Sequence, residues 1–88
     1  MMLNLTFDFR QLPDREAFYA ALVRQSHCPF AFGNNLDALW DWLTGGMALP
    51  ATLHLRHVDE SNVEFAPVLA LLEEAVAQLE GELRLVRD

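Results

Sequence analysis

The sequence contains no lysine. Its 88 residues carry six arginines against 13 acidic side chains, and the formal charge is −7. Proteins that bind nucleic acid do so largely through the phosphates, which requires a patch or stripe of basic side chains. The charge balance therefore argues against nucleic acid as a partner.

Long hydrophobic runs and cysteines are equally scarce. The longest apolar run, Ala17 to Val23, is far shorter than the roughly 18 to 20 residues needed to cross a bilayer. The first ten residues lack the basic and then apolar regions of a secretory signal, and a single cysteine, Cys28, cannot form an internal disulfide. We therefore expect a reduced, cytoplasmic protein with no membrane segment. A chain of this length with 52% hydrophobic residues can build one core, so we expect a single domain over residues 1–88.

Residues that commonly build enzyme and metal sites form no recognisable set here. His54 and His57 are three apart on an expected strand, which turns their side chains to opposite faces, and no second cysteine or carboxylate pair completes a metal site. Cys28 stands beside His27, but neighbours in sequence rarely meet in the geometry of a catalytic dyad. We expect no metal, no cofactor and no enzymatic activity.

Hydrophobic periodicity divides the chain into strands and helices. Alternation with a period of two predicts strands at 3–10, 51–56 and 82–87, and helical spacing predicts helices at 13–27, 35–44 and 67–80. The order strand, two helices, strand, helix, strand favours an α/β layer architecture with at least one crossover connection. Because the strands alternate and are not apolar throughout, we expect helices on one face of the sheet and water on the other.

The second expected helix has two distinct faces. Its apolar side chains fall on one side, with the tryptophan at the border: Leu36, Leu39, Trp40 and Leu43. Its polar side chains cluster on the other: Asp37, Asp41 and Thr44. We expect the two glycines that follow, Gly45 and Gly46, to supply the left-handed residue that commonly ends a helix.

The polar face of this helix breaks a local rule twice. Asp37 and Asp41 are four residues apart, a spacing at which like charges destabilise a helix. Asp41 also lies toward the expected carboxyl end, where the helix dipole repels an anion. Such violations often mark a functional surface. A merely solvated acidic face is the simpler interpretation on helix statistics alone.

The run from Phe32 to Pro50, FGNNLDALWDWLTGGMALP, resembles the signature of the barstar family, intracellular protein inhibitors of secreted microbial ribonucleases of the barnase type. A string of this kind is hard to meet by chance. The resemblance implies a three-stranded parallel sheet with three main helices packed on one face. It also implies a protein that acts by binding and not by chemistry.

The resemblance further implies which residues touch the partner. Asp41 is the expected anchor, with its carboxylate in the ribonuclease pocket for the substrate phosphate. The other expected partner-binding residues are Phe32, Asn35, Leu36, Asp37, Trp40, Thr44, Gly45 and Glu80, the last as an acidic contact from the last helix. Inhibition is then steric and competitive, and we expect a monomer when the protein is free.

Four positions depart from a well-known member of the family. Ala31 stands where that member has a second aromatic residue, and Gly46 where it has a tryptophan. Ala48 replaces a glutamate, and Val76 replaces an acidic residue of the last helix. We therefore expect the partner to be a related or divergent small basic ribonuclease.

Two other interpretations stay open. The same acidic helix could serve a regulatory or scaffolding module that binds a basic protein other than a nuclease, and the departures at Gly46 and Ala48 favour this somewhat. An acid-base enzyme using Asp37 and Asp41 is disfavoured, because carboxylates on an exposed helix face lack the burial that tunes a catalytic acid. Competition by RNA fragments separates the first alternative from the inhibitor, since only the inhibitor must exclude RNA.

Overall fold

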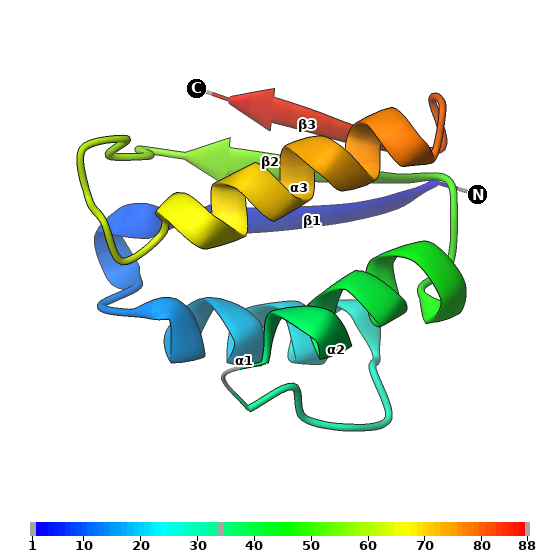
Figure 1. The fold of residues 1–88 in the computed structure, drawn as a ribbon, viewed down its shortest axis with the longest axis horizontal. Helices are drawn as coiled ribbons and strands as arrows, with labels where there is room; N and C mark the ends of the chain where they lie inside the picture. Colours follow the sequence, from blue (N-terminus) through cyan, green and yellow to red (C-terminus); the bar gives the residue numbers. More distant parts are fainter. Residues whose placement is uncertain (1, 34, 88) are drawn as a thin grey trace.

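The structure, a computed structural model, describes residues 2–33 and 35–87. Within these ranges, three strands and three α-helices occur in the order that the hydrophobic pattern predicts, with two short helical turns between them (Figure 1). The elements are β1 Leu3–Asp8, η1 Phe9–Gln11, α1 Arg15–Ser26, α2 Leu36–Asp41, η2 Trp42–Gly46, β2 Ala51–Arg56, α3 Ala66–Gln78 and β3 Leu83–Arg87. The expected α/β class is confirmed.

The strands form one parallel sheet in the order β1-β2-β3. Leu53 in the central strand is in register with Leu5 on one side and with Leu85 on the other. Parallel neighbours require crossover connections. The first crossover contains α1 and α2 and the second contains α3, which confirms the parallel sheet that the family resemblance implies.

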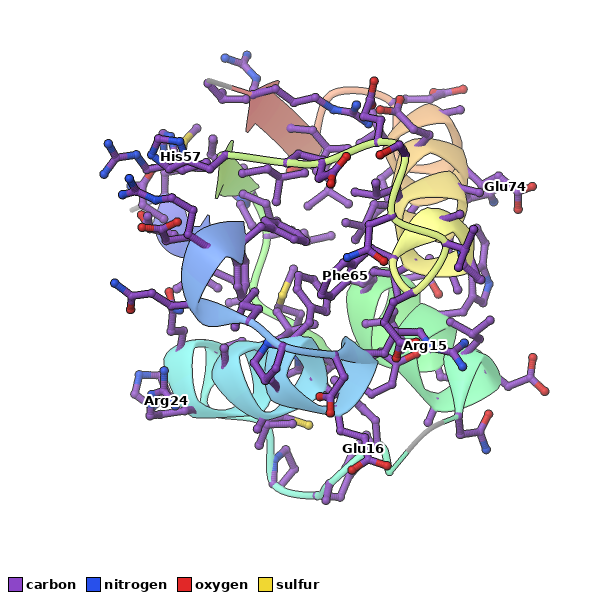
Figure 2. All side chains as sticks on the ribbon, turned by 90° about the vertical axis from the view of Figure 1, so that its left-hand side faces the viewer. Arg15, Glu16, Arg24, His57, Phe65 and Glu74 are labelled. Atoms are coloured by element: carbon purple, nitrogen blue, oxygen red, sulfur yellow. The ribbon has the colours of Figure 1, made fainter. Side chains whose placement is uncertain are left out.

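The sheet is buried on one face. The side chains on its inner face are almost completely buried: Leu5, Phe7, Leu53, Leu55 and Leu83. Asn4, Thr6 and Arg84 on the outer face are exposed, although Thr52 is buried. In Figure 2 the three helices lie together on one side of the sheet. The one-faced arrangement predicted from the alternation is confirmed.

The first strand ends two residues earlier than its alternation predicts. Asp8 accepts hydrogen bonds from the backbone N–H of Arg10 at 3.0 Å and from Nε of the same arginine at 3.2 Å, and these bonds start the turn η1. Phe9 still packs into the core, with its ring centroid 5.9 Å from that of Phe18 and 5.0 Å from that of Phe65. Burial thus extends beyond the strand, so alternation alone places the end of the strand too late.

Helix α1 has a capped amino end and is joined to β1 by hydrogen bonds. Asp14 accepts the backbone N–H of Ala17 at 2.9 Å, as its expected N-cap position requires. Near the other end, the Gln25 side-chain amide donates to the Thr6 carbonyl at 2.8 Å, and its oxygen accepts the Thr6 N–H at 2.9 Å. Gln25 therefore pairs with both backbone groups of Thr6 at the free edge of β1, as a residue of a neighbouring strand would.

Helix α3 carries Pro67 in its first turn, as predicted, and ends at Gln78. Glu80 and Gly81 follow with positive φ angles of 44° and 94°. Glu80 therefore lies in the turn after α3 and not on the helix, which corrects the sequence interpretation. The physical reason is that the positive φ angles of Glu80 and Gly81 interrupt the helical backbone, and the chain then enters β3 at Leu83.

Candidate functional site

The polar face predicted from the sequence lies on α2 and η2, which together form the helical segment 36–46. Asn35 caps this segment: its Oδ1 accepts the backbone N–H of Asp37 at 2.8 Å and that of Ala38 at 3.4 Å. Asp37 lies in the first turn, where the helix dipole favours a negative charge. The amino end of the segment is therefore well defined.

The carboxyl end of the segment differs from the prediction. Helix α2 ends at Asp41, and the chain continues in a wider π turn, η2, in which the Met47 N–H donates to the Trp42 carbonyl at 2.7 Å. Gly45 and Gly46 lie inside this turn, and neither has a positive φ. The prediction that they supply a left-handed terminating residue is wrong, because the backbone stays helical through both of them.

The indole of Trp42 organises the π turn. Trp42 is 8% exposed, and its Nε1–H donates to the Ser26 hydroxyl of α1 at 2.9 Å. A Cβ atom on Gly46 would lie 2.5 Å from Cε3 of this ring, so a side chain at position 46 has no room. Gly46 stands where a well-known family member has a tryptophan; in this chain the indole of Trp42 lies beside the same turn.

The apolar side of the segment anchors it to the core. Leu39 and Leu43 are completely buried, as the periodicity predicts. Leu36 and Trp40 are half-buried and pack against the core from the edge of the stripe. The segment also packs against α3. Because this side is fixed inward, the opposite face of the segment points to solvent.

Two unpaired carboxylates occupy this solvent face. Asp37 and Asp41 are exposed, and within residues 2–33 and 35–87 neither side chain has a hydrogen bond or ion pair. Elsewhere in the described residues, arginines form ion pairs: Arg10 with Asp8 (3.1 Å), Arg15 with Glu64 (3.6 Å), and Arg87 with Glu73 (3.0 Å) and Glu60. The continuation of the helix through η2 places Asp41 near the middle of the segment, so the expected dipole repulsion, which is confined to the last turn, falls away.

Asp41 borders a hollow in the surface of about 410 Å³. The other lining residues are Phe30, Trp42, Thr44, Gly45 and Gly46. The structure thus brings together three predicted site residues, Asp41, Thr44 and Gly45, and adds Phe30, which the sequence analysis missed. Phe30 and Phe32 stand two residues apart in a loop without periodicity, and no sequence signal tells the exposed ring from the buried one.

Three other predicted residues, Asn35, Leu36 and Asp37, line a second hollow of about 410 Å³ together with Arg15. Figure 2 shows Arg15 at the start of α1. The carboxylate of Glu64 accepts the backbone N–H of Arg15 at 3.1 Å and lies 3.6 Å from its Nε. This end of the segment therefore adjoins an arginine whose charge is already balanced by Glu64, whereas no arginine lines the hollow beside Asp41.

Two predicted residues lie apart from the solvent face of the segment. Phe32 is 4% exposed, and its ring packs edge-to-face on Tyr19 with centroids 6.1 Å apart. Glu80 is exposed in the turn after α3. Figure 1 shows that this turn and the end of η2 lie at the same end of the molecule. Phe32 thus supports the loop before α2 from within, whereas Glu80 is open to solvent.

Local pairing and packing shift the pKa values of several side chains. The Arg10 guanidinium lowers the pKa of Asp8, and hydrogen bonds from Ser61 lower the pKa of Asp59. Burial raises the pKa of Tyr19. These shifts reflect local pairing and packing, and none of the three groups belongs to the segment 36–46.

The described residues can also be compared with the requirements of a metal site and of a membrane-spanning helix. Strand β2 ends at Arg56, so His57, with a φ of 58°, follows the strand, and His54 and His57 do not both lie on it. Across residues 2–33 and 35–87, no three His, Cys, Asp or Glu side chains are grouped so that they could hold a metal ion. In the same ranges, no helix has the length and apolar character needed to span a membrane.

Comparison with known proteins matches nearly the whole chain, both to a family model and to a curated relative. Residues 2–87 match the family model described as "Barstar (barnase inhibitor)". The chain is also 34% identical over 89 residues to a protein of Bacillus subtilis (strain 168) named "Putative ribonuclease inhibitor YrdF", an alignment that covers 97% of this chain and 98% of the relative. Both matches reach far beyond the run from Phe32 to Pro50.

Proposed function

Because the chain belongs to the barstar family, we propose that it is a protein inhibitor of a small basic ribonuclease of the barnase type. It binds through the segment 36–46 and its capping residue Asn35, and it sterically blocks the active site. In this proposal the protein performs no chemistry and needs no cofactor. It acts in the cytoplasm, where it protects the cell from the nuclease before export.

The observation that carries this proposal is the pair of exposed, unpaired carboxylates, Asp37 and Asp41, on a helix whose other side is buried. A ribonuclease active site is a cationic cleft built to hold phosphate, so carboxylates on a fixed helix can take the phosphate positions. The formal charge of −7 adds long-range attraction to a basic partner, an effect for which the barnase and barstar pair is the standard example.

Each predicted contact residue has a distinct part in the proposed complex. Asp41 is the anchor that enters the phosphate pocket. The residues around it on the segment and its cap contact the rim of the cleft: Asn35, Leu36, Asp37, Trp40, Thr44 and Gly45. Glu80 adds an acidic contact from the turn after α3. The buried ring of Phe32 acts from behind the surface, by fixing the loop that leads into the segment.

Inhibition of purified barnase tests the proposal. The chain is titrated into the enzyme while cleavage of a short fluorogenic RNA is followed. We expect activity to fall as the inhibitor is added, and we expect a non-cleavable RNA fragment to slow formation of the complex because both need the same cleft. Full cleavage in the presence of excess chain contradicts inhibition of this enzyme.

Capture of partners from the native host extends the test to a divergent ribonuclease. The tagged chain is exposed to lysate and culture supernatant, and each retained protein is assayed for ribonuclease activity with and without the chain. Capture of a basic nuclease whose activity the chain inhibits supports the proposal. A basic partner with no nuclease activity, bound through Asp41, favours the regulatory or scaffolding interpretation instead.

A further inference from the structure

An exposed aromatic ring stands next to the anchoring carboxylate. Within the described ranges, the exposed large apolar side chains are Met2, Phe30, Val63 and Val86. Phe30 is the aromatic member of this group, with 46% of its surface exposed, and it lines the same hollow as Asp41. An apolar ring and a carboxylate thus face one concave surface.

Phe30 is held in place through both its ring and its backbone. Its ring meets those of Phe32 and Trp42 edge-to-face, with centroids 5.7 and 5.8 Å away. Its carbonyl oxygen accepts a hydrogen bond from the Cys28 thiol at 3.1 Å, and the Cys28 N–H donates to the Val23 carbonyl at 3.0 Å. A ring that is already fixed loses little conformational entropy when a partner covers it.

Apart from the Trp42 ring, the remaining walls of the hollow are formed by small residues, and none of them carries a charge. A Cβ atom on Gly45 would meet no atom within 4 Å, so the surface there is open to close approach. The Thr44 hydroxyl donates to the Trp40 carbonyl at 2.8 Å, so its proton is used within the helix. Among the lining residues, Asp41 carries the one charge, and the hollow therefore suits a cation with an apolar or planar body.

We propose that this hollow receives one arginine side chain of the basic partner, with its guanidinium paired to Asp41 and its planar face against the ring of Phe30. Guanidinium is more weakly hydrated than ammonium, stacks on aromatic rings and matches a carboxylate with two parallel hydrogen bonds. Phe30 is then a specificity-determining residue that favours arginine over lysine at this position. The inference rests on the proposed function, because it takes this surface to be the partner-binding face.

A titration with amino-acid probes tests the inference without a ribonuclease. The isotopically labelled chain is titrated with Nα-acetyl-argininamide and, separately, with Nα-acetyl-lysinamide. The amide signals of Gly45 and Gly46 and the indole N–H signal of Trp42 report on the hollow. We expect the arginine probe to shift these signals several-fold more than the lysine probe at equal concentration.

Three variants make the titration specific. F30L keeps apolar bulk but removes the ring, and D41N removes the charge; each should abolish the preference for arginine. V63A alters an exposed apolar side chain outside the hollow and should leave the shifts unchanged. Equal shifts by both probes, absence of shifts, or an F30L variant that titrates as the parent chain would each overturn the inference.

The two proposals fail separately. If the chain inhibits barnase but shows no preference for the arginine probe, the role of Phe30 is wrong and the inhibitor proposal stands. If the arginine preference is present and depends on Phe30 and Asp41, but neither barnase nor a captured nuclease is inhibited, the inhibitor proposal is wrong and the hollow still recognises arginine.

Discussion

The indole N–H of Trp42 donates a 2.9 Å hydrogen bond to the Ser26 hydroxyl, which donates in turn to the Leu22 carbonyl at 2.6 Å. Both side chains are buried. This chain of bonds ties the π turn after Asp41 to the last turn of α1. The orientation of the acidic face is therefore set partly by the preceding helix, α1.

Removing the acceptor tests this tie. S26A leaves the buried indole N–H of Trp42 without a partner, and we expect it to lower the free energy of unfolding by about 1–3 kcal/mol. Urea midpoints followed by far-ultraviolet circular dichroism give the values. In a W42F background the donor is gone, so the same serine change should cost less. An S26A cost below about 0.5 kcal/mol, the range of ordinary surface substitutions, contradicts the role of the bond.

The two adjacent glycines of η2 should respond in opposite directions to alanine. A Cβ atom on Gly46 would press on the Trp42 ring at 2.5 Å, and we expect G46A to destabilise by about 1–3 kcal/mol through overpacking. Gly45 has open space and no positive φ, so G45A should gain up to about 1 kcal/mol of helix propensity. Denaturant unfolding of the pair measures both values, and equal effects would show that the indole does not cover position 46.

Much of the fold could be predicted from local sequence because the determining interactions are local. Alternation gives the inner face of each strand, and Asp14 and Pro67 mark the starts of α1 and α3. The π turn could not be predicted in this way. It depends on the fit of Trp42 between Gly46 and Ser26, and helical periodicity carries no information about a contact with another helix.

The candidate site also combines features that the sequence predicts with features that depend on tertiary packing. Helical spacing turns Asp37 and Asp41 away from Leu39 and Leu43, so the periodicity alone predicts their exposure. Exposure of Phe30 and burial of Phe32 depend on which ring packs against Tyr19 in α1. Tertiary packing determines which of the two rings is buried, and the loop sequence contains no pattern that predicts it.

The pairing of Asp8 with Arg10 should make the stability of the protein depend on pH in the acidic range. The hydrogen bonds and charge of Arg10 lower the pKa of Asp8 below its ordinary value of 3.8. A carboxyl whose pKa is lower in the folded state stabilises the fold above the unfolded pKa, and this contribution is lost as the pH falls through the folded pKa. We therefore expect the parent chain to be more stable than D8N near neutral pH, with the difference shrinking as the pH falls below about 3.8. Urea titrations of both proteins at several pH values measure it; a difference that does not change with pH would contradict the pairing.

We expect a substitution at Asp41 to change the stability of the free protein and its affinity for the partner in opposite directions. D41N removes the repulsion between Asp37 and Asp41, so the free protein should gain about 0.2–0.5 kcal/mol. In the proposed complex the same change takes a charge out of a cationic pocket, and binding should weaken by at least about 2 kcal/mol, the usual threshold for a hot spot, for which barstar itself is a standard example.

The most direct test of the inhibitor proposal is the affinity of D41N for barnase, or for the nuclease captured from the native host, measured beside E74Q. Glu74 is exposed, and Figure 2 shows its side chain projecting outward from α3, so E74Q removes the same charge from another surface. We predict that D41N binds at least about 30-fold more weakly than the parent chain, whereas E74Q binds nearly as well. If D41N binds as tightly as E74Q, the acidic face of the segment 36–46 does not occupy the ribonuclease active site.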